Sequence, residues 1–267
     1  MTDEPFGPQA SGDREQESEP GGALARAVAR IRADPFLLVP FALAGLLLSL
    51  LDQLRLWDPI PTLVTERLPA LAIDFEFSIF PTGTPGTTRR VAALVDLETP
   101  YLLWAVSLEV AAVLAVSIAG WYTIARAADA DATTTGLRSY VGFVVLIAIG
   151  GRLLGSIAEV TLSGIVGLAL FLLLFVLALV VLARLFVAPA IAALGSSPWV
   201  AIRRSVRLSS GHEYGLVGLV LFYGLLGWLL GSVPAIGAVV SSVGVAVVHA
   251  VSTVTVLESV SDNDLLE

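Results

Sequence analysis

Two residues of opposite charge stand inside apolar stretches of the chain, Glu109 and Arg152. Glu109 lies about 12 Å into segment 101–125 at 1.5 Å per helical residue, and Arg152 lies about as far from the end of segment 138–160. A lone arginine at mid-membrane costs roughly 2.5–3.5 kcal/mol, so a partner is strongly favoured. The sequence therefore predicts an intramembrane ion pair between Glu109 and Arg152. Such a pair either locks two helices together or forms a polar site for transport.

A serine and a histidine in apolar segments raise the question of an intramembrane hydrolase. Ser163-Gly164 and His249 do not support one, because Ser163 falls at the outer end of its segment and His249 in the inner half of another. Nucleophile and base must be in contact for this chemistry. With two His and no Cys, a dedicated zinc site is not expected either. We expect no catalytic residues, no metal, no cofactor and no enzymatic activity.

A short basic motif, Ser197-Pro198-Trp199-Val200-Ala201-Ile202-Arg203-Arg204-Ser205-Val206-Arg207-Leu208-Ser209-Ser210-Gly211, predicts an amphipathic helix. Ser197 suits the N-cap, Pro198 the first helical position and Gly211 the C-terminal cap. One face collects Trp199, Ile202 and Val206, and another collects Arg203, Arg204 and Arg207. Segment 23–33 shows a similar pattern with Arg26 and Arg30. These arginines either bind anionic lipid headgroups or only fix the topology.

The motif also resembles a family. A basic A-x-R-R-S-x-R-L-x-x-G element between the fourth and fifth of six spans is similar to six-helix archaeal and bacterial membrane proteins of unassigned function. These resemble the membrane domain fused to some glycerophosphodiester phosphodiesterases. The matching residues are Ala201, Arg203, Arg204, Ser205, Arg207, Leu208 and Gly211. The resemblance implies an architecture and no catalytic residues. The chain has no room for the roughly 250 residues of a soluble barrel.

Composition determines the fold class. The chain has 267 residues, of which 56% are hydrophobic and 14% charged, against about 25% charged in an ordinary soluble domain. Six apolar segments approach the ~20 residues that a spanning helix needs. They are 36–56, 101–125, 138–160, 163–188, 214–232 and 235–257. The sequence predicts an all-α polytopic membrane bundle of about six transmembrane helices with interfacial amphipathic helices.

The apolar segments divide the chain into three parts. Residues 1–22 are predicted to be a disordered acidic tail, 23–258 a six-helix membrane domain with an outer loop at 57–99, and 259–267 a short acidic cytoplasmic tail. Arginines cluster before the first and fifth spans, and the turns after the third and fifth spans carry none. The positive-inside rule then predicts that both termini face the cytoplasm.

All 15 basic residues are arginine, and the net charge is −8. Such a composition indicates a halophilic archaeon, although a GC-rich actinobacterium would give a similar arginine bias.

The leading functional hypothesis is a non-enzymatic protein of the cell membrane that organises the membrane or assists a partner. The alternative is a small permease or channel with a polar site around Glu109 and Arg152. Expected partners are membrane lipids, including lipids with anionic headgroups, and a second copy or another membrane protein, but not nucleic acid.

Two pairs of glycines at four-residue spacing allow close contact between helices, Gly151 with Gly155 and Gly227 with Gly231. Either pair could form a dimer face or pack within the bundle, and intramolecular packing is the simpler expectation.

Overall fold

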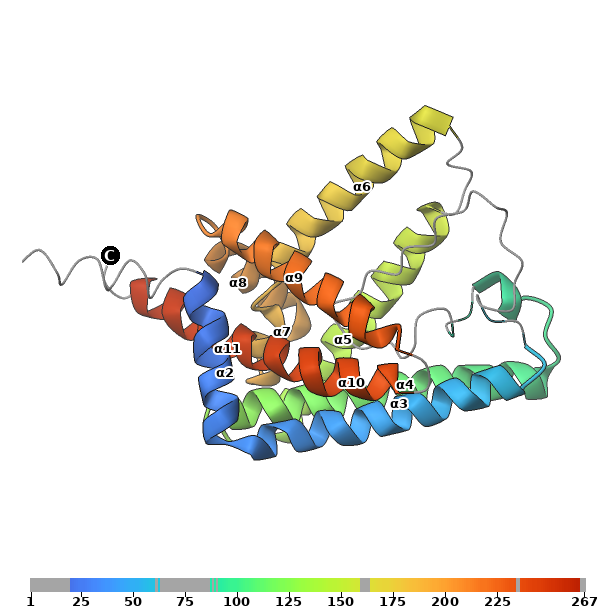
Figure 1. The fold of residues 1–267 in the computed structure, drawn as a ribbon, viewed down its shortest axis with the longest axis horizontal. Coiled ribbons are helices and arrows are strands. Elements are labelled where there is room, and N and C mark those ends of the chain that lie inside the picture. The colour runs from blue at the N-terminus through green and yellow to red at the C-terminus, as the bar shows by residue number, and fades with distance from the viewer. Residues whose placement is uncertain are drawn as a thin grey trace, which may run out of the picture.

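The computed structural model describes residues 20–60, 62, 87, 89, 91–158, 164–233 and 236–264. The described parts fold into helices and contain no strand (Figure 1). The helices are α2 (Pro20–Ala33), η1 (Pro35–Leu38), α3 (Val39–Trp57), η2 (Val91–Leu94), α4 (Thr99–Ala127), α5 (Thr134–Ala158), α6 (Gly164–Arg184), α7 (Ala188–Ala193), α8 (Pro198–Leu208), α9 (Glu213–Gly231), α10 (Gly237–Ser241), η3 (Ser242–Ala246) and α11 (Val247–Asp264). The predicted tail at 1–22 lies outside the described residues up to residue 19, and α11 continues beyond the predicted end of the domain at 258.

Five helical stretches of the described chain are long and apolar enough to cross a membrane. They are Pro35–Trp57, Thr99–Ala127, Thr134–Gly151, Glu213–Gly231 and Gly237–Ser261. The prediction of an all-α helical bundle is confirmed. The fourth predicted segment forms α6, which has 21 residues, but its side chains are continuously described only over Leu172–Arg184, so a sixth span stays a prediction.

Lipid-facing surfaces are visible in the pattern of exposure. On α3, Leu43, Leu46, Leu47 and Leu50 are exposed, and α6 exposes a longer run of leucines and valines. A soluble monomer rarely exposes apolar patches of more than a few hundred Å². These faces therefore indicate that hydrocarbon, and not water, surrounds the middle of the bundle.

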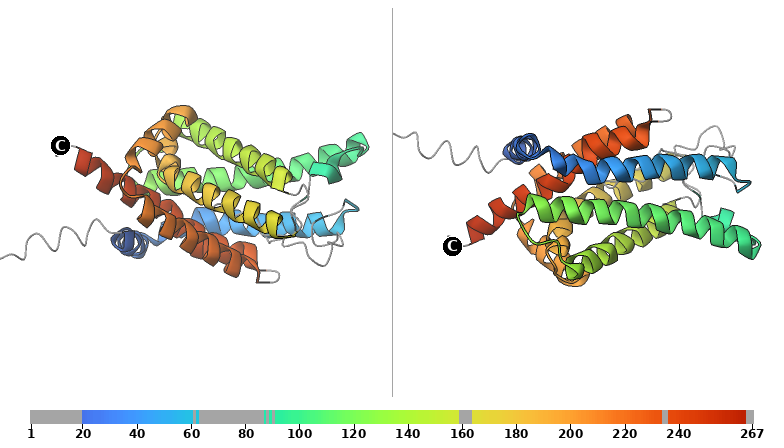
Figure 2. Two further views of the ribbon diagram at one scale, coloured as in Figure 1. Left: turned by 90° about the horizontal axis from the view of Figure 1, so that it is seen from above. Right: turned by 90° about the horizontal axis from the view of Figure 1, so that it is seen from below.

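The helices have two distinct ends. At one end α3 leads through residues 58–98 to α4, and we call this the loop end. At the other, α2, α8 and the last turns of α11 come together, and we call this the tail end (Figure 1). Helices α3 and α4 lie side by side between these ends in both views of Figure 2. Asp34 separates α2 from η1 and α3. Its side chain accepts a hydrogen bond from the Phe36 amide and so caps the start of η1, whose first residue is Pro35.

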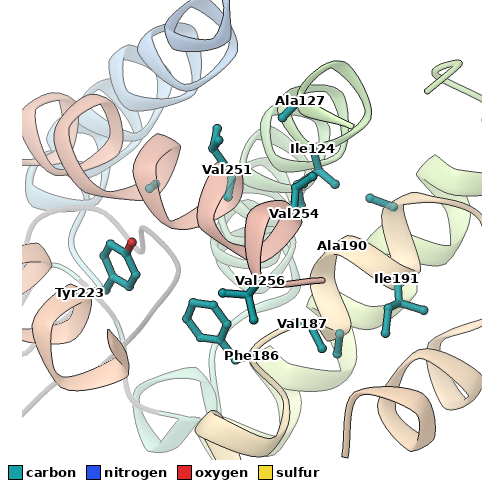
Figure 3. Packing of buried hydrophobic residues seen from close by; sticks show 14 of the residues in the cluster. Ile124, Ala127, Phe186, Val187, Ala190, Ile191, Tyr223, Val251, Val254 and Val256 are labelled. Carbon is teal, nitrogen blue, oxygen red and sulfur yellow. The ribbon is translucent and has the colours of Figure 1, made fainter. Parts of the chain in front are cut away.

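The largest hydrophobic cluster surrounds the short helix α7. All residues from Phe186 to Ala193 are buried. Figure 3 shows Phe186, Val187, Ala190 and Ile191 packed among side chains from α4, α9 and α11. The segment between the fourth and fifth predicted spans thus enters the bundle instead of running over its surface, and it fills the tail end with apolar side chains.

Two close approaches depend on glycine. A Cβ on Gly45 of α3 would lie 2.9 Å from the Cα of Val239 in α10, and a Cβ on Gly237 would lie 2.0 Å from the carbonyl oxygen of Gly231. Gly231, the second member of one predicted glycine pair, therefore packs within the chain, against the start of α10. A Cβ on Gly151 would meet no atom within 4 Å in the described structure.

Candidate functional site

A buried arginine at the loop end is the centre of a charge cluster. Arg55 lies in the last turn of α3 and is only 1% exposed. Its Nη1 lies 3.1 Å from Oδ1 of Asp52, and its Nη2 lies 3.0 Å from Oε1 of Glu109 on α4. A buried charge without a partner is very costly. The three side chains therefore tie the end of α3 to α4.

Two residues of the connecting segment, Thr87 and Arg89, extend this cluster. The Thr87 hydroxyl donates a hydrogen bond of 2.9 Å to Asp52. Arg89, which is 4% exposed, pairs with Asp58 and also approaches the carbonyl oxygen of Arg55 at 3.5 Å. We call Asp52, Arg55, Asp58, Thr87, Arg89 and Glu109 the loop-end cluster. It joins α3, α4 and the described part of the loop through charge-assisted contacts.

A second ion pair lies near the tail end. Arg126 of α4 donates from Nη2 to Oδ1 of Asp34 at 3.1 Å, and this guanidinium holds the pKa of Asp34 below its ordinary value. Glu109 and Arg126 are 17 residues apart in one helix, which corresponds to about 26 Å. The hydrocarbon core is about 30 Å thick. The two ion pairs on α4 are therefore separated by slightly less than the thickness of the hydrocarbon core, and the predicted depth of Glu109 in the membrane stays a prediction.

The structure describes only the backbone of Arg152, the predicted partner of Glu109. The backbone of Arg152 lies in α5, while its side chain lies outside the described residues. The Glu109–Arg152 pair therefore stays a prediction, and the contact that the structure describes is between Glu109 and Arg55. Sequence reasoning missed Asp52 and Arg55 because both looked like the charged end of a span. Their three-residue spacing was the available signal, since it places them on one helical face.

The tail end carries the second group of predicted residues. Helix α2 packs against α11, where Arg30 pairs with Glu258 at 3.1 Å and Arg26 donates to the Ser259 hydroxyl at 3.4 Å. Both arginines that were predicted to face lipid headgroups from segment 23–33 thus take part in a contact between two helices.

The arginines of α8 differ from those of α2. Arg203, Arg204 and Arg207 are exposed, and none has a carboxylate partner in the described part of the chain. The Arg203 guanidinium lies 5.1 Å from the ring centroid of Trp199. This helix therefore presents three positive charges and an exposed indole at the tail end.

His249 lies in the apolar core. The centroid of its ring lies 5.4 Å from that of Phe186 and 5.3 Å from that of Tyr223, in edge-on contacts. The Tyr223 hydroxyl lies 2.6 Å from the Ser252 hydroxyl. Figure 3 shows Phe186 and Tyr223 within this packing. Ser163 lies outside the described residues. Within the described ranges, no three His, Cys, Asp or Glu side chains gather as metal ligands would.

The fold and the apolar surfaces define the class: an all-α helical bundle with several candidate spans, as in multi-pass membrane proteins. No protein-family model, curated protein or solved structure matches the chain.

Proposed function

We propose that this chain is a non-enzymatic, multi-pass protein of the cell membrane that organises the membrane or assists a partner from the cytoplasmic side. The observation that supports this most strongly is the packing of α7, because the tail end of the bundle is filled by buried apolar residues from Phe186 to Ala193. This apolar packing leaves the exposed groups of the tail end as the surface available for interactions.

The proposal includes an orientation with both termini in the cytoplasm. The arginines of the tail end support it, since α2, α8 and the beginning of α5 carry many of the positive charges. They are Arg26, Arg30, Arg32, Arg138, Arg203, Arg204 and Arg207. The loop-end cluster, in contrast, contains three acidic and two basic residues.

Transport is the second candidate, and one observation favours it. Charged residues on two apolar helices meet at the loop end, as they do along ion paths. The pairing of these charges with one another and with Thr87 and Arg89, together with the packing of α7 at the other end, favours the first proposal.

The chain has no cysteine, so single cysteines report accessibility directly. We would place one at Asp131, in the link between α4 and α5, and one at Val95, between η2 and α4; both positions are exposed. With a membrane-impermeant maleimide on intact cells, we expect Val95→Cys to react and Asp131→Cys to react only after permeabilisation. Reaction of both from the same side would overturn the topology.

A flux assay separates the two candidate functions. Purified protein in sealed vesicles is compared with protein-free vesicles for ion leak and for solute-driven swelling. We expect equal rates. A protein-dependent flux that Glu109→Gln abolishes would establish the transport candidate and overturn the first proposal.

A further inference from the structure

We infer that α8 binds the phosphate headgroups of anionic lipids in the cytoplasmic leaflet, through Arg203, Arg204 and Arg207. This inference rests on the orientation proposed above, and it names the partner of the tail-end surface. It also separates α8 from α2, whose arginines the sequence predicted to have the same role.

The faces of α8 are clearly divided. Ala201, Ser205 and Leu208 are buried against the bundle. At 100° per residue, the three arginines fall within an arc of about 100°, whose centre lies about 120° around the helix from the centre of the buried face. Trp199 and Val206 occupy the adjoining edge, and Trp199 is 59% exposed. A positive face beside an exposed aromatic and aliphatic edge is the arrangement of a helix lying in the membrane interface.

The position of α8 is fixed by the end of α6. The carbonyl oxygen of Arg184 accepts hydrogen bonds from Ser205 at 2.7 Å and Ser209 at 3.3 Å. The Arg184 guanidinium donates to the Val206 carbonyl at 3.2 Å and the Ser210 hydroxyl at 2.9 Å. These four contacts hold α8 against rotation, so its arginines keep facing away from the bundle.

Charge complementarity identifies the occupant. Within the described chain, Arg30, Arg126 and Arg184 of the tail end are each paired with a carboxylate, namely Glu258, Asp34 and Glu213. Arg32 of α2 and Arg138 of α5 are exposed without such a partner, but only α8 has three such arginines on one helix in the described part of the chain. The α8 arginines have no carboxylate partner in the described chain, and the phosphates of lipids beside α8 in the membrane interface can take that place. Guanidinium groups bind phosphate oxygens through paired, charge-assisted hydrogen bonds. Each arginine near an anionic surface contributes roughly a fivefold gain in affinity.

The experiment compares two triple variants of the full-length chain that remove equal charge from the same end. One is Arg203→Gln/Arg204→Gln/Arg207→Gln, and the control is Arg26→Gln/Arg30→Gln/Arg32→Gln. Each protein is reconstituted in vesicles of equal phosphatidylglycerol and phosphatidylcholine. Native mass spectrometry after extraction then gives the ratio of the two lipids that remain bound.

We expect wild type and the α2 control to retain phosphatidylglycerol at least fivefold over phosphatidylcholine. The α8 variant should bind both lipids about equally, and an Arg→Lys version at the same three positions should recover most of the preference. An unchanged preference in the α8 variant, or an equal loss in the control, would overturn the inference. Displacement of the lipid by inorganic phosphate would also overturn it, because the ligand would then be a soluble anion.

The same variants carry the Asp131 and Val95 cysteine reporters. If wild-type labelling gives the opposite topology, the proposed function fails by that result alone. If the topology holds and the lipid ratio does not respond to α8, only the present inference fails.

Discussion

At the level of single residues, Arg55 has the most demanding environment in the described structure. It is almost fully buried, yet it neutralises carboxylates on two helices. Removing one partner of a buried ion pair usually costs about 3–5 kcal/mol, whereas replacing all members by apolar groups is often neutral. The penalty arises from the charge left behind, so single and combined substitutions should differ strongly.

A double-mutant cycle tests this directly. We expect Arg55→Gln to lower the free energy of unfolding by about 3 kcal/mol, because Asp52 and Glu109 remain buried as carboxylates. Adding Glu109→Gln should recover part of the loss and give a coupling energy of about 1–3 kcal/mol. The measurement is equilibrium unfolding in mixed micelles, followed by tryptophan fluorescence.

The predicted Glu109–Arg152 pair has its own cycle with the same Glu109→Gln variant. Coupling in both cycles would mean that Glu109 serves two arginines. Additive effects of Arg55→Gln and Glu109→Gln would contradict the described ion pair, whatever the result at Arg152.

Residue types and spacing predict only part of the environment of Glu109. That Glu109 needs a basic partner follows from the cost of a buried charge. The contact of Glu109 with Arg55 does not follow from this cost, because it depends on which helix end lies next to Glu109. The sequence indicated Arg152 on the following span, and that pair stays a prediction. The described contact with Arg55 comes from the preceding span, where α3 and α4 lie side by side (Figure 2).

At the level of elements, the contact of α3 with α10 is set by one glycine. A Cβ at Gly45 would lie 2.9 Å from the backbone of Val239 and 3.1 Å from the Ser242 Cβ. Backbone cannot move aside as a flexible side chain can. The contact also adjoins η3, a π-helical turn that interrupts the last span, a feature that membrane helices tolerate where neighbouring helices hold them.

We therefore predict that Gly45→Ala destabilises the protein by about 1–3 kcal/mol through overpacking. Gly218→Ala in α9 is the matched control, because its Cβ would meet no atom within 4 Å. That change should stabilise by up to about 1 kcal/mol, since alanine is the better helix former. Thermal unfolding in detergent measures both. Equal effects would mean that α3 and α10 are not in close contact.

The elements also separate what sequence could predict from what it could not. Helical type followed from the apolar runs, and the structure confirms it. The burial of α7 and the packing of α2 on α11 did not follow. An Ala-rich, Arg-bearing segment has the same pattern whether it rests on lipid or on another helix, so only tertiary contacts decide.

At the level of the whole molecule, two layers of ion pairs bracket the apolar part of α3 and α4. Arg126 with Asp34 forms one layer, and Arg55 with Glu109 the other, separated by about 26 Å along α4. Helix α4 itself has 29 residues, or about 43 Å, and is longer than the hydrocarbon core. The charge layers, and not the length of the helix, should therefore determine which bilayer thickness suits the protein.

The two charge layers predict a stability optimum in bilayers with hydrocarbon about 26–30 Å thick, because thicker bilayers would bury the loop-end cluster in lipid. Unfolding temperature in vesicles of increasing acyl-chain length measures it. In the variant Asp52→Asn/Arg55→Met/Glu109→Gln the loop-end layer is uncharged, and Val106 and Val110 of α4 are already exposed and apolar. Its optimum should move to bilayers several Å thicker, since apolar surface would then extend towards the start of α4. An optimum that stays in place would mean that helix packing, and not the loop-end charges, sets the thickness.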